Sequence, residues 1–67
     1  MIQLSVNGEV KQLPGPVHIA QLLEVMTLTG KKLAVERNGE IVPRSRYAET
    51  PLRDGDQLEI VVAVGGG

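Results

Sequence analysis

Two Asn-Gly pairs, at positions 7–8 and 38–39, constrain the fold of this chain more than any other feature. Asparagine and glycine both tolerate positive φ, so an Asn-Gly pair between extended segments favours a type I′ turn and a β-hairpin. Before the first pair, apolar and polar residues alternate in IQLSVN, as in a strand with one buried face. EVKQL follows that pair, and KLAVER and EIV flank the second. The sequence therefore predicts two hairpins.

A helix is expected between the hairpins. The prolines of PGP supply no amide hydrogen and should end the first hairpin. In residues 17–30, VHIAQLLEVMTLTG, apolar residues recur at the spacing of one helical face. Gly30 stands where a left-handed C-terminal cap is expected, and Lys31 and Lys32 would complement the helix dipole there. No Ser, Thr or Asp marks the N-terminal end of this helix.

The last third of the chain predicts a loop and then a strand. Residues 43–57, PRSRYAETPLRDGDQ, are rich in turn residues and should form a loop with at most one helical turn, from Arg46 to Glu49. Residues 58–64, LEIVVAV, carry one charge, Glu59. Near-continuous apolar runs are typical of strands that are covered on both faces or lie centrally in a sheet. We expect this strand in the middle, paired with the first strand.

Together these elements predict an α+β fold, a β-grasp in which a mixed sheet of four to five strands packs on one main helix. The domain should span residues 1–64, and residues 65–67 should form a flexible glycine tail. The expected core consists of Ile2, Leu4, Val6, Ile19, Leu22, Leu23, Met26, Val35, Leu58, Ile60 and Val62.

Composition excludes several functional classes. The net charge of −1 and the single aromatic residue, Tyr47, argue against nucleic-acid binding. No apolar run approaches the roughly 20 residues that span a bilayer. The N-terminus lacks a signal-peptide pattern, so a cytoplasmic location is expected. The absence of cysteine removes thiolate nucleophiles and the usual zinc ligands, and no metal site is predicted.

Few side chains suggest chemistry. His18 is the only histidine, has no nucleophile paired with it by motif, and is expected to be structural or solvent-facing. RDGD lacks the rest of a calcium loop and is interpreted as a turn. Arg44 and Arg46 are interpreted as a solvated face. No glycine-rich phosphate loop precedes a helix, so any ATP would be bound by a partner.

The chain ends in three glycines, Gly65, Gly66 and Gly67. Glycine has no Cβ, so such a run adopts almost any φ and ψ and can enter a channel too narrow for side chains. The terminal α-carboxylate is the one chemical group at its end. On composition alone the alternative is a disordered terminus.

The segment NGEIVPRSRYAETPLRDGDQLEIVVAVGGG resembles the sulfur carrier proteins of thiamine biosynthesis, a ubiquitin-like β-grasp family that ends in Gly-Gly. The resemblance depends on VPRS, on DGD before the last strand and on the glycine end, which occur in family order. It covers about the last half of the chain, and the first half matches mainly in pattern.

This resemblance implies a protein co-substrate that is not itself an enzyme and binds no cofactor. An E1-like adenylyltransferase would use ATP to adenylate the carboxylate of Gly67, and a sulfur-donating enzyme would convert it to a thiocarboxylate. Thiazole synthase would receive the sulfur, with Gly65 and Gly66 threading into its site. An alternative is that a protease first removes Gly67, leaving Gly66 as the carrier end.

A docking surface is predicted beside the tail. Alternation along the last strand turns Glu59, Val61 and Ala63 away from the core, and we expect Val61 and Ala63 to bind the E1-like partner. Two alternatives remain at this point. One is a sulfur carrier for molybdopterin synthesis, and the other is a ubiquitin-like interaction module with an inert tail.

Overall fold

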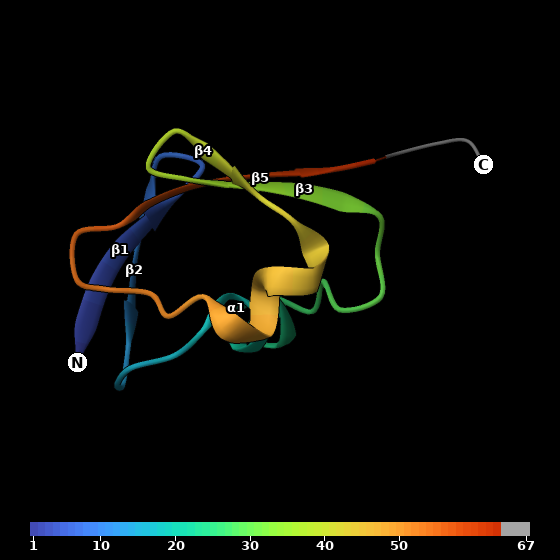
Figure 1. Ribbon diagram of the computed structural model, residues 1–67. Coiled ribbons are helices and arrows are strands. Elements are labelled where there is room, and N and C mark those ends of the chain that lie inside the picture. Colours follow the sequence, from blue (N-terminus) through green and yellow to red (C-terminus); the bar gives the residue numbers. More distant parts are fainter. Residues whose placement is uncertain (64–67) are drawn as a thin grey trace.

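The computed structural model describes residues 1–63 and contains one mixed sheet. Its elements are β1 (Ile2–Val6), β2 (Glu9–Leu13), α1 (Ile19–Val25), β3 (Leu33–Arg37), β4 (Glu40–Val42), the 3₁₀ helix η1 (Arg44–Glu49) and β5 (Gln57–Val62). The five strands lie in the order β2-β1-β5-β3-β4, and α1 and η1 lie on one side of them (Figure 1). The predicted α+β class is confirmed.

Both Asn-Gly pairs form the predicted hairpin turns. Asn7 and Gly8 have φ of 52° and 84°, and Asn38 and Gly39 have φ of 51° and 86°. Two consecutive residues with positive φ are the requirement of a type I′ turn. β1 and β2 pair antiparallel around the first turn, as β3 and β4 do around the second.

β5 lies at the centre of the sheet, as predicted. It pairs parallel with β1 and antiparallel with β3, so it joins two hairpins that do not pair with each other. Only one face of the strand is covered, as the predicted exposure of Glu59, Val61 and Ala63 requires. Leu58 and Ile60 are buried, whereas Glu59 and Val61 are exposed on the opposite face. The strand spans Gln57–Val62 where residues 58–64 were expected, and residue 64 lies outside the described part.

α1 is shorter than predicted, because it ends well before Gly30. Thr27 adopts φ of 61° directly after the C-cap residue Met26, and that conformation cannot continue a helix. The Thr27 amide donates to the Glu24 carbonyl at 3.0 Å and the Leu28 amide to the Leu23 carbonyl at 2.8 Å, which is a Schellman motif. Gly30 has a positive φ, but it lies in the loop after the helix and does not cap it. Lys31 and Lys32 therefore do not lie in the last turn of α1, where they were expected to complement the helix dipole.

His18 supplies the N-terminal cap for which the sequence offered no Ser, Thr or Asp. Its Nδ1 accepts from the Gln21 amide at 3.2 Å, and the Gln21 Oε1 accepts from the His18 amide at 2.9 Å. These reciprocal bonds form a capping box. The structural role expected for His18 is thereby confirmed.

The core sits between the sheet and the two helices. Most of the expected members are buried, while Ile2, Met26 and Val62 are only partly buried against the core. Three further members were missed, namely Leu13, Tyr47 and Leu52. Tyr47 is buried because residues 44–49 form η1, about two turns at three residues each, and not a loop with a single turn at 46–49.

Candidate functional site

The end of β5 carries an exposed apolar surface on the face opposite α1. The side chain of Val61 is 65% exposed, and Ala63 is exposed as well. Ala34 of β3 pairs with Val61 of β5 and is also exposed. Ile41 of β4, which pairs with Glu36 of β3 on the same face, is 67% exposed. We call Ala34, Ile41, Val61 and Ala63 the outer patch. Its exposure agrees with a docking role for Val61 and Ala63, which stays a prediction.

Backbone pairing holds the chain up to the last described residue. Val62 pairs with Leu33, and the Ala63 amide donates to the Lys32 carbonyl at 2.8 Å. Gly65, Gly66 and Gly67 lie outside the described residues, so the structure does not describe the predicted tail. The structure does show that the chain just before the tail, Val62 and Ala63, is held to β3 and to Lys32 by backbone pairing. We call this segment the fixed base.

The first turn asparagine also clamps β5. β1 ends at Val6, and the Asn7 side chain then bonds to both main-chain groups of Ile60. The Asn7 Oδ1 accepts from the Ile60 amide at 2.7 Å, and its Nδ2 donates to the Ile60 carbonyl at 3.0 Å. A side-chain amide thus extends the β1–β5 ladder beyond the end of β1.

The second turn asparagine acts from the other side of β5. The Asn38 Oδ1 accepts from the Gln57 amide at 2.9 Å, and the Asn38 main-chain amide donates to the Gln57 carbonyl at 2.7 Å. Sequence reasoning missed both clamps. The Asn-Gly signal accounts for the turn alone, and nothing in it specifies a partner that lies 53 residues away for Asn7 or 19 residues away for Asn38.

A buried carboxylate anchors the start of β5. Asp56 is 6% exposed, and its Oδ2 accepts from Arg37 Nε and from the Arg53 amide, each at 2.8 Å. Its Oδ1 accepts from Asn38 Nδ2 at 3.1 Å and from Arg37 Nη2 at 3.4 Å. Burial alone raises the pKa of Asp56. The hydrogen bonds from Arg37, Arg53 and Asn38, with the charge of Arg37, outweigh burial and lower that pKa below its ordinary value of 3.8.

The DGD segment is the turn that the sequence predicted. Gly55 has φ of 90°, and the Asp54 Oδ1 accepts from the Gln3 amide at 2.7 Å. No group of three or more His, Cys, Asp or Glu side chains among residues 1–63 is arranged to hold a metal ion. Within the same residues, no helix has the length and apolar character needed to cross a membrane.

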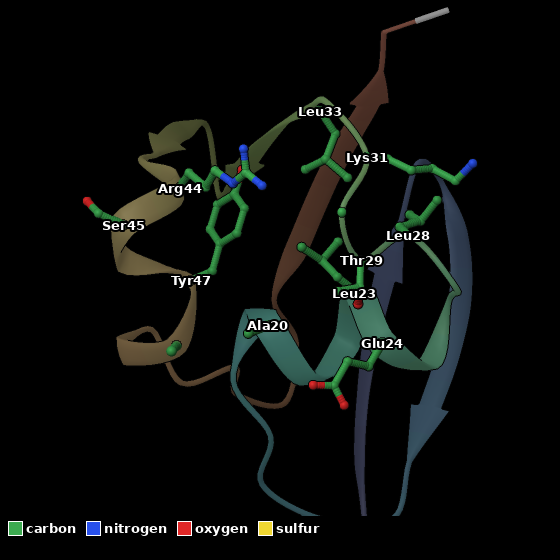
Figure 2. Close-up of a pocket in the computed structure, with 12 residues that line it drawn as sticks. Ala20, Leu23, Glu24, Leu28, Thr29, Lys31, Leu33, Arg44, Ser45 and Tyr47 are labelled. Carbon is green, nitrogen blue, oxygen red and sulfur yellow. The ribbon is translucent and has the colours of Figure 1, made fainter.

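A pocket of about 260 Å³ lies on the helix side of the sheet (Figure 2). Its apolar surface comes from Leu23 of α1, from Leu28 in the following loop and from Leu33 of β3. Arg44 and Tyr47 of η1 form the opposite wall. We call this cavity the helix-side pocket. Sequence reasoning interpreted Arg44 as part of a solvated face, because a loop was expected where η1 forms.

Comparison with known proteins finds relatives that match nearly the whole chain. The model of the ThiS family matches residues 4–67. The sulfur carrier protein ThiS of Bacillus subtilis is 45% identical over 65 residues, which are 96% of this chain and 98% of that protein. A thiazole synthase of Paramagnetospirillum magneticum is 44% identical over 66 residues, or 98% of this chain, and the chain spans only 20% of that synthase.

A solved structure agrees with the fold. The crystal structure of a thiamine biosynthesis protein (ThiS) from Geobacter metallireducens superposes with a TM-score of 0.83 at 30% identity. The match covers 98% of this chain and 100% of that one. It confirms the predicted β-grasp arrangement of sheet and helix.

Proposed function

The chain belongs to the ThiS family of sulfur carriers for thiamine biosynthesis, and from this premise we propose that the α-carboxylate of Gly67 is the group that carries sulfur. The observation that carries the proposal is the match to a named sulfur carrier over nearly the full length of both chains. Named thiamine proteins among the relatives favour this carrier over the molybdopterin alternative.

Loading takes two steps in this proposal. A carboxylate anion resists nucleophilic attack, so its oxygen first attacks the α-phosphorus of ATP, and pyrophosphate leaves. The resulting mixed anhydride has an electrophilic carbonyl and a good leaving group. Sulfur at the oxidation level of sulfide then attacks the carbonyl carbon, the bond to AMP breaks, and a thiocarboxylate remains on Gly67.

Partners supply all the catalysis. We infer that an E1-like adenylyltransferase binds ATP and docks on the outer patch, that a separate enzyme donates the sulfur, and that thiazole synthase accepts it, all in the cytoplasm. The chain itself holds no cofactor in this scheme. A thiazole synthase that contains a segment similar to this chain supports the synthase as a partner. Members of the family are carriers and not catalysts.

The described contacts fix the position of β5, the strand that precedes the proposed reactive end. β5 is clamped by Asn7 and Asn38, anchored by Asp56 and paired through Ala63. A fixed base reduces the conformational freedom that docking must remove, so the partner has only the last residues to position. Positioning matters because a misplacement of about 1 Å can cost roughly a hundredfold in rate.

Intact mass of the natural protein tests the proposal. After expression with its own pathway enzymes, a fraction of the chains should have one terminal oxygen replaced by sulfur, and fragment masses should locate it on Gly67. A chain that is never loaded would support the inert interaction module. Sulfur on Gly66 in chains that lack Gly67 would support prior proteolysis and reject Gly67 as the carrier residue.

A further inference from the structure

The helix-side pocket has a size and lining that the tail chemistry does not use. Its volume of about 260 Å³ is below the range of typical small-molecule sites, about 300 to 1,000 Å³, and suits one inserted side chain. The three leucines at positions 23, 28 and 33 provide an apolar floor. Anchors of protein interfaces occupy pockets of this kind, with a polar rim around them.

The rim of the pocket is more positive than the chain as a whole. Lys31 and Arg44 line it together with one acid, Glu24, whereas the chain has a net charge of −1. Within residues 1–63, neither Lys31 nor Arg44 takes part in an ion pair. Unpaired cations beside an apolar floor favour an occupant that combines an apolar side chain with a neighbouring carboxylate.

Tyr47 and Arg44 make this wall well defined. Tyr47 is 9% exposed and is held in the core, while Arg44 is exposed. Figure 2 shows Arg44 and Tyr47 on one side of the opening and Leu33 and Leu23 on the other. This wall therefore combines a buried, fixed ring with an exposed positive charge.

The pocket borders the same strand end as the outer patch, but on the other side of the sheet. Leu33 lines the pocket and pairs with Val62, whereas Val61 points to the opposite face. Two different proteins can thus approach the base of the tail through two different surfaces. This arrangement suits a sulfur carrier that must bind two enzymes, one that loads it with sulfur and one that accepts the sulfur.

Building on the proposed function, we propose that the helix-side pocket docks thiazole synthase by receiving an apolar side chain that lies next to a carboxylate on the synthase surface. The outer patch is then left to the activating enzyme. The carboxylate pairs with Arg44, and the apolar side chain contacts Leu23, Leu28 and Leu33.

Calorimetric titration of the chain with purified thiazole synthase from the same organism tests this docking. Arg44→Glu should weaken binding by at least about tenfold, because it replaces an attraction by a repulsion. Ala48→Phe should do the same by filling the opening without a change of charge, since Ala48 lines the pocket. Arg46→Glu is the matched control. Arg46 lies in η1 too, is exposed and does not line this pocket, so binding should change less than about twofold.

Loading by the activating enzyme separates this proposal from the function on which it rests. All three variants should keep their melting temperatures and should still be converted to the thiocarboxylate. Equal affinities for Arg44→Glu and Arg46→Glu would overturn the pocket assignment and leave the proposed function intact. Lost loading with unchanged synthase affinity would assign the pocket to the activating enzyme and overturn the docking proposal. A wild-type chain that does not bind the synthase would reject the proposed partner as well.

Discussion

Replacement of Asp56 by asparagine should reveal how strongly the start of β5 depends on one carboxylate. An asparagine can keep one oxygen toward Arg37 Nε and the Arg53 amide, the two shortest contacts. Its NH₂ group then faces Arg37 Nη2 and Asn38 Nδ2, which are both donors. Asn38 cannot turn its amide to help without losing the bond from the Gln57 amide.

The magnitude follows from these contacts. Hydrogen bonds to a charged group contribute about 1.5 to 3 kcal/mol each, and breaking a buried pair costs about 3 to 5 kcal/mol. The Arg37 side chain remains 28% exposed, so water recovers part of this loss. We expect a decrease of about 2 to 3 kcal/mol in the free energy of unfolding, out of roughly 3 to 10 kcal/mol for a domain of this size. The melting temperature should fall by about 10 to 20 °C.

Urea and thermal unfolding between neutral and acid pH provide the assay. The pKa of Asp56 is lowered in the folded state, so its stabilisation is complete above the unfolded value near 3.8 and is lost as pH falls through the folded value. The gap between the wild-type protein and Asp56→Asn should therefore be full at pH 7 and shrink below about pH 3.8. Asp54→Asn is the control, because Asp54 is exposed and the amide oxygen can still accept from Gln3. Equal losses for the two variants, or a gap that widens in acid, would refute this reasoning.

Three further predictions concern other parts of the molecule. Val61→Asp should weaken binding to the E1-like enzyme by at least about tenfold without a change in melting temperature. The control Val10→Asp, at a similarly exposed position on β2, should leave the affinity unchanged. Unfolding of Val61→Asp, or equal affinities of the two variants, would reject the outer patch. Asn7→Gly keeps the turn but removes both bonds to Ile60, so denaturant titration should show a loss of about 1 to 3 kcal/mol, and no loss would show that the clamp is unimportant. Thr27→Gly should raise the free energy of unfolding, measured by calorimetry, by about 0.5 to 1 kcal/mol, because glycine adopts positive φ without the strain of a β-branched side chain. The control Thr29→Gly should lower that free energy, because Thr29 has no positive φ to relieve.

Patterns that are local in sequence predicted the structure where local physics decides it. Both Asn-Gly turns and the alternation in β1 need only neighbouring residues, and they were predicted correctly. The end of α1 was not, because a threonine in the left-handed region is disfavoured by its own side chain and is held there by surrounding contacts. Gly30 was the better local candidate for a cap, but the chain had already left the helix at Thr27.

Features that depend on distant contacts escaped prediction. Asp56 belongs to a three-residue turn motif in the sequence, and only the fold brings Arg37 and Asn38 to its carboxylate. Tyr47 was the single aromatic residue in a polar segment and gave no sign that η1 would bury it. The helix-side pocket could not be predicted for the same reason, since one of its walls is η1.

Among residues 1–63, the central strand is also the last strand in chain order, and this affects how the domain folds during synthesis. When the ribosome has produced both hairpins, β1 and β3 each still have one open edge, because β5 is their only common neighbour in the sheet. The β1–β5 and β3–β5 contacts close long loops, which slows folding and prolongs the exposure of those edges. A nascent chain that stops before Gln57 is therefore not a smaller version of this domain. Its two hairpins lack the strand that joins them, and open strand edges of this kind favour aggregation and chaperone binding over folding.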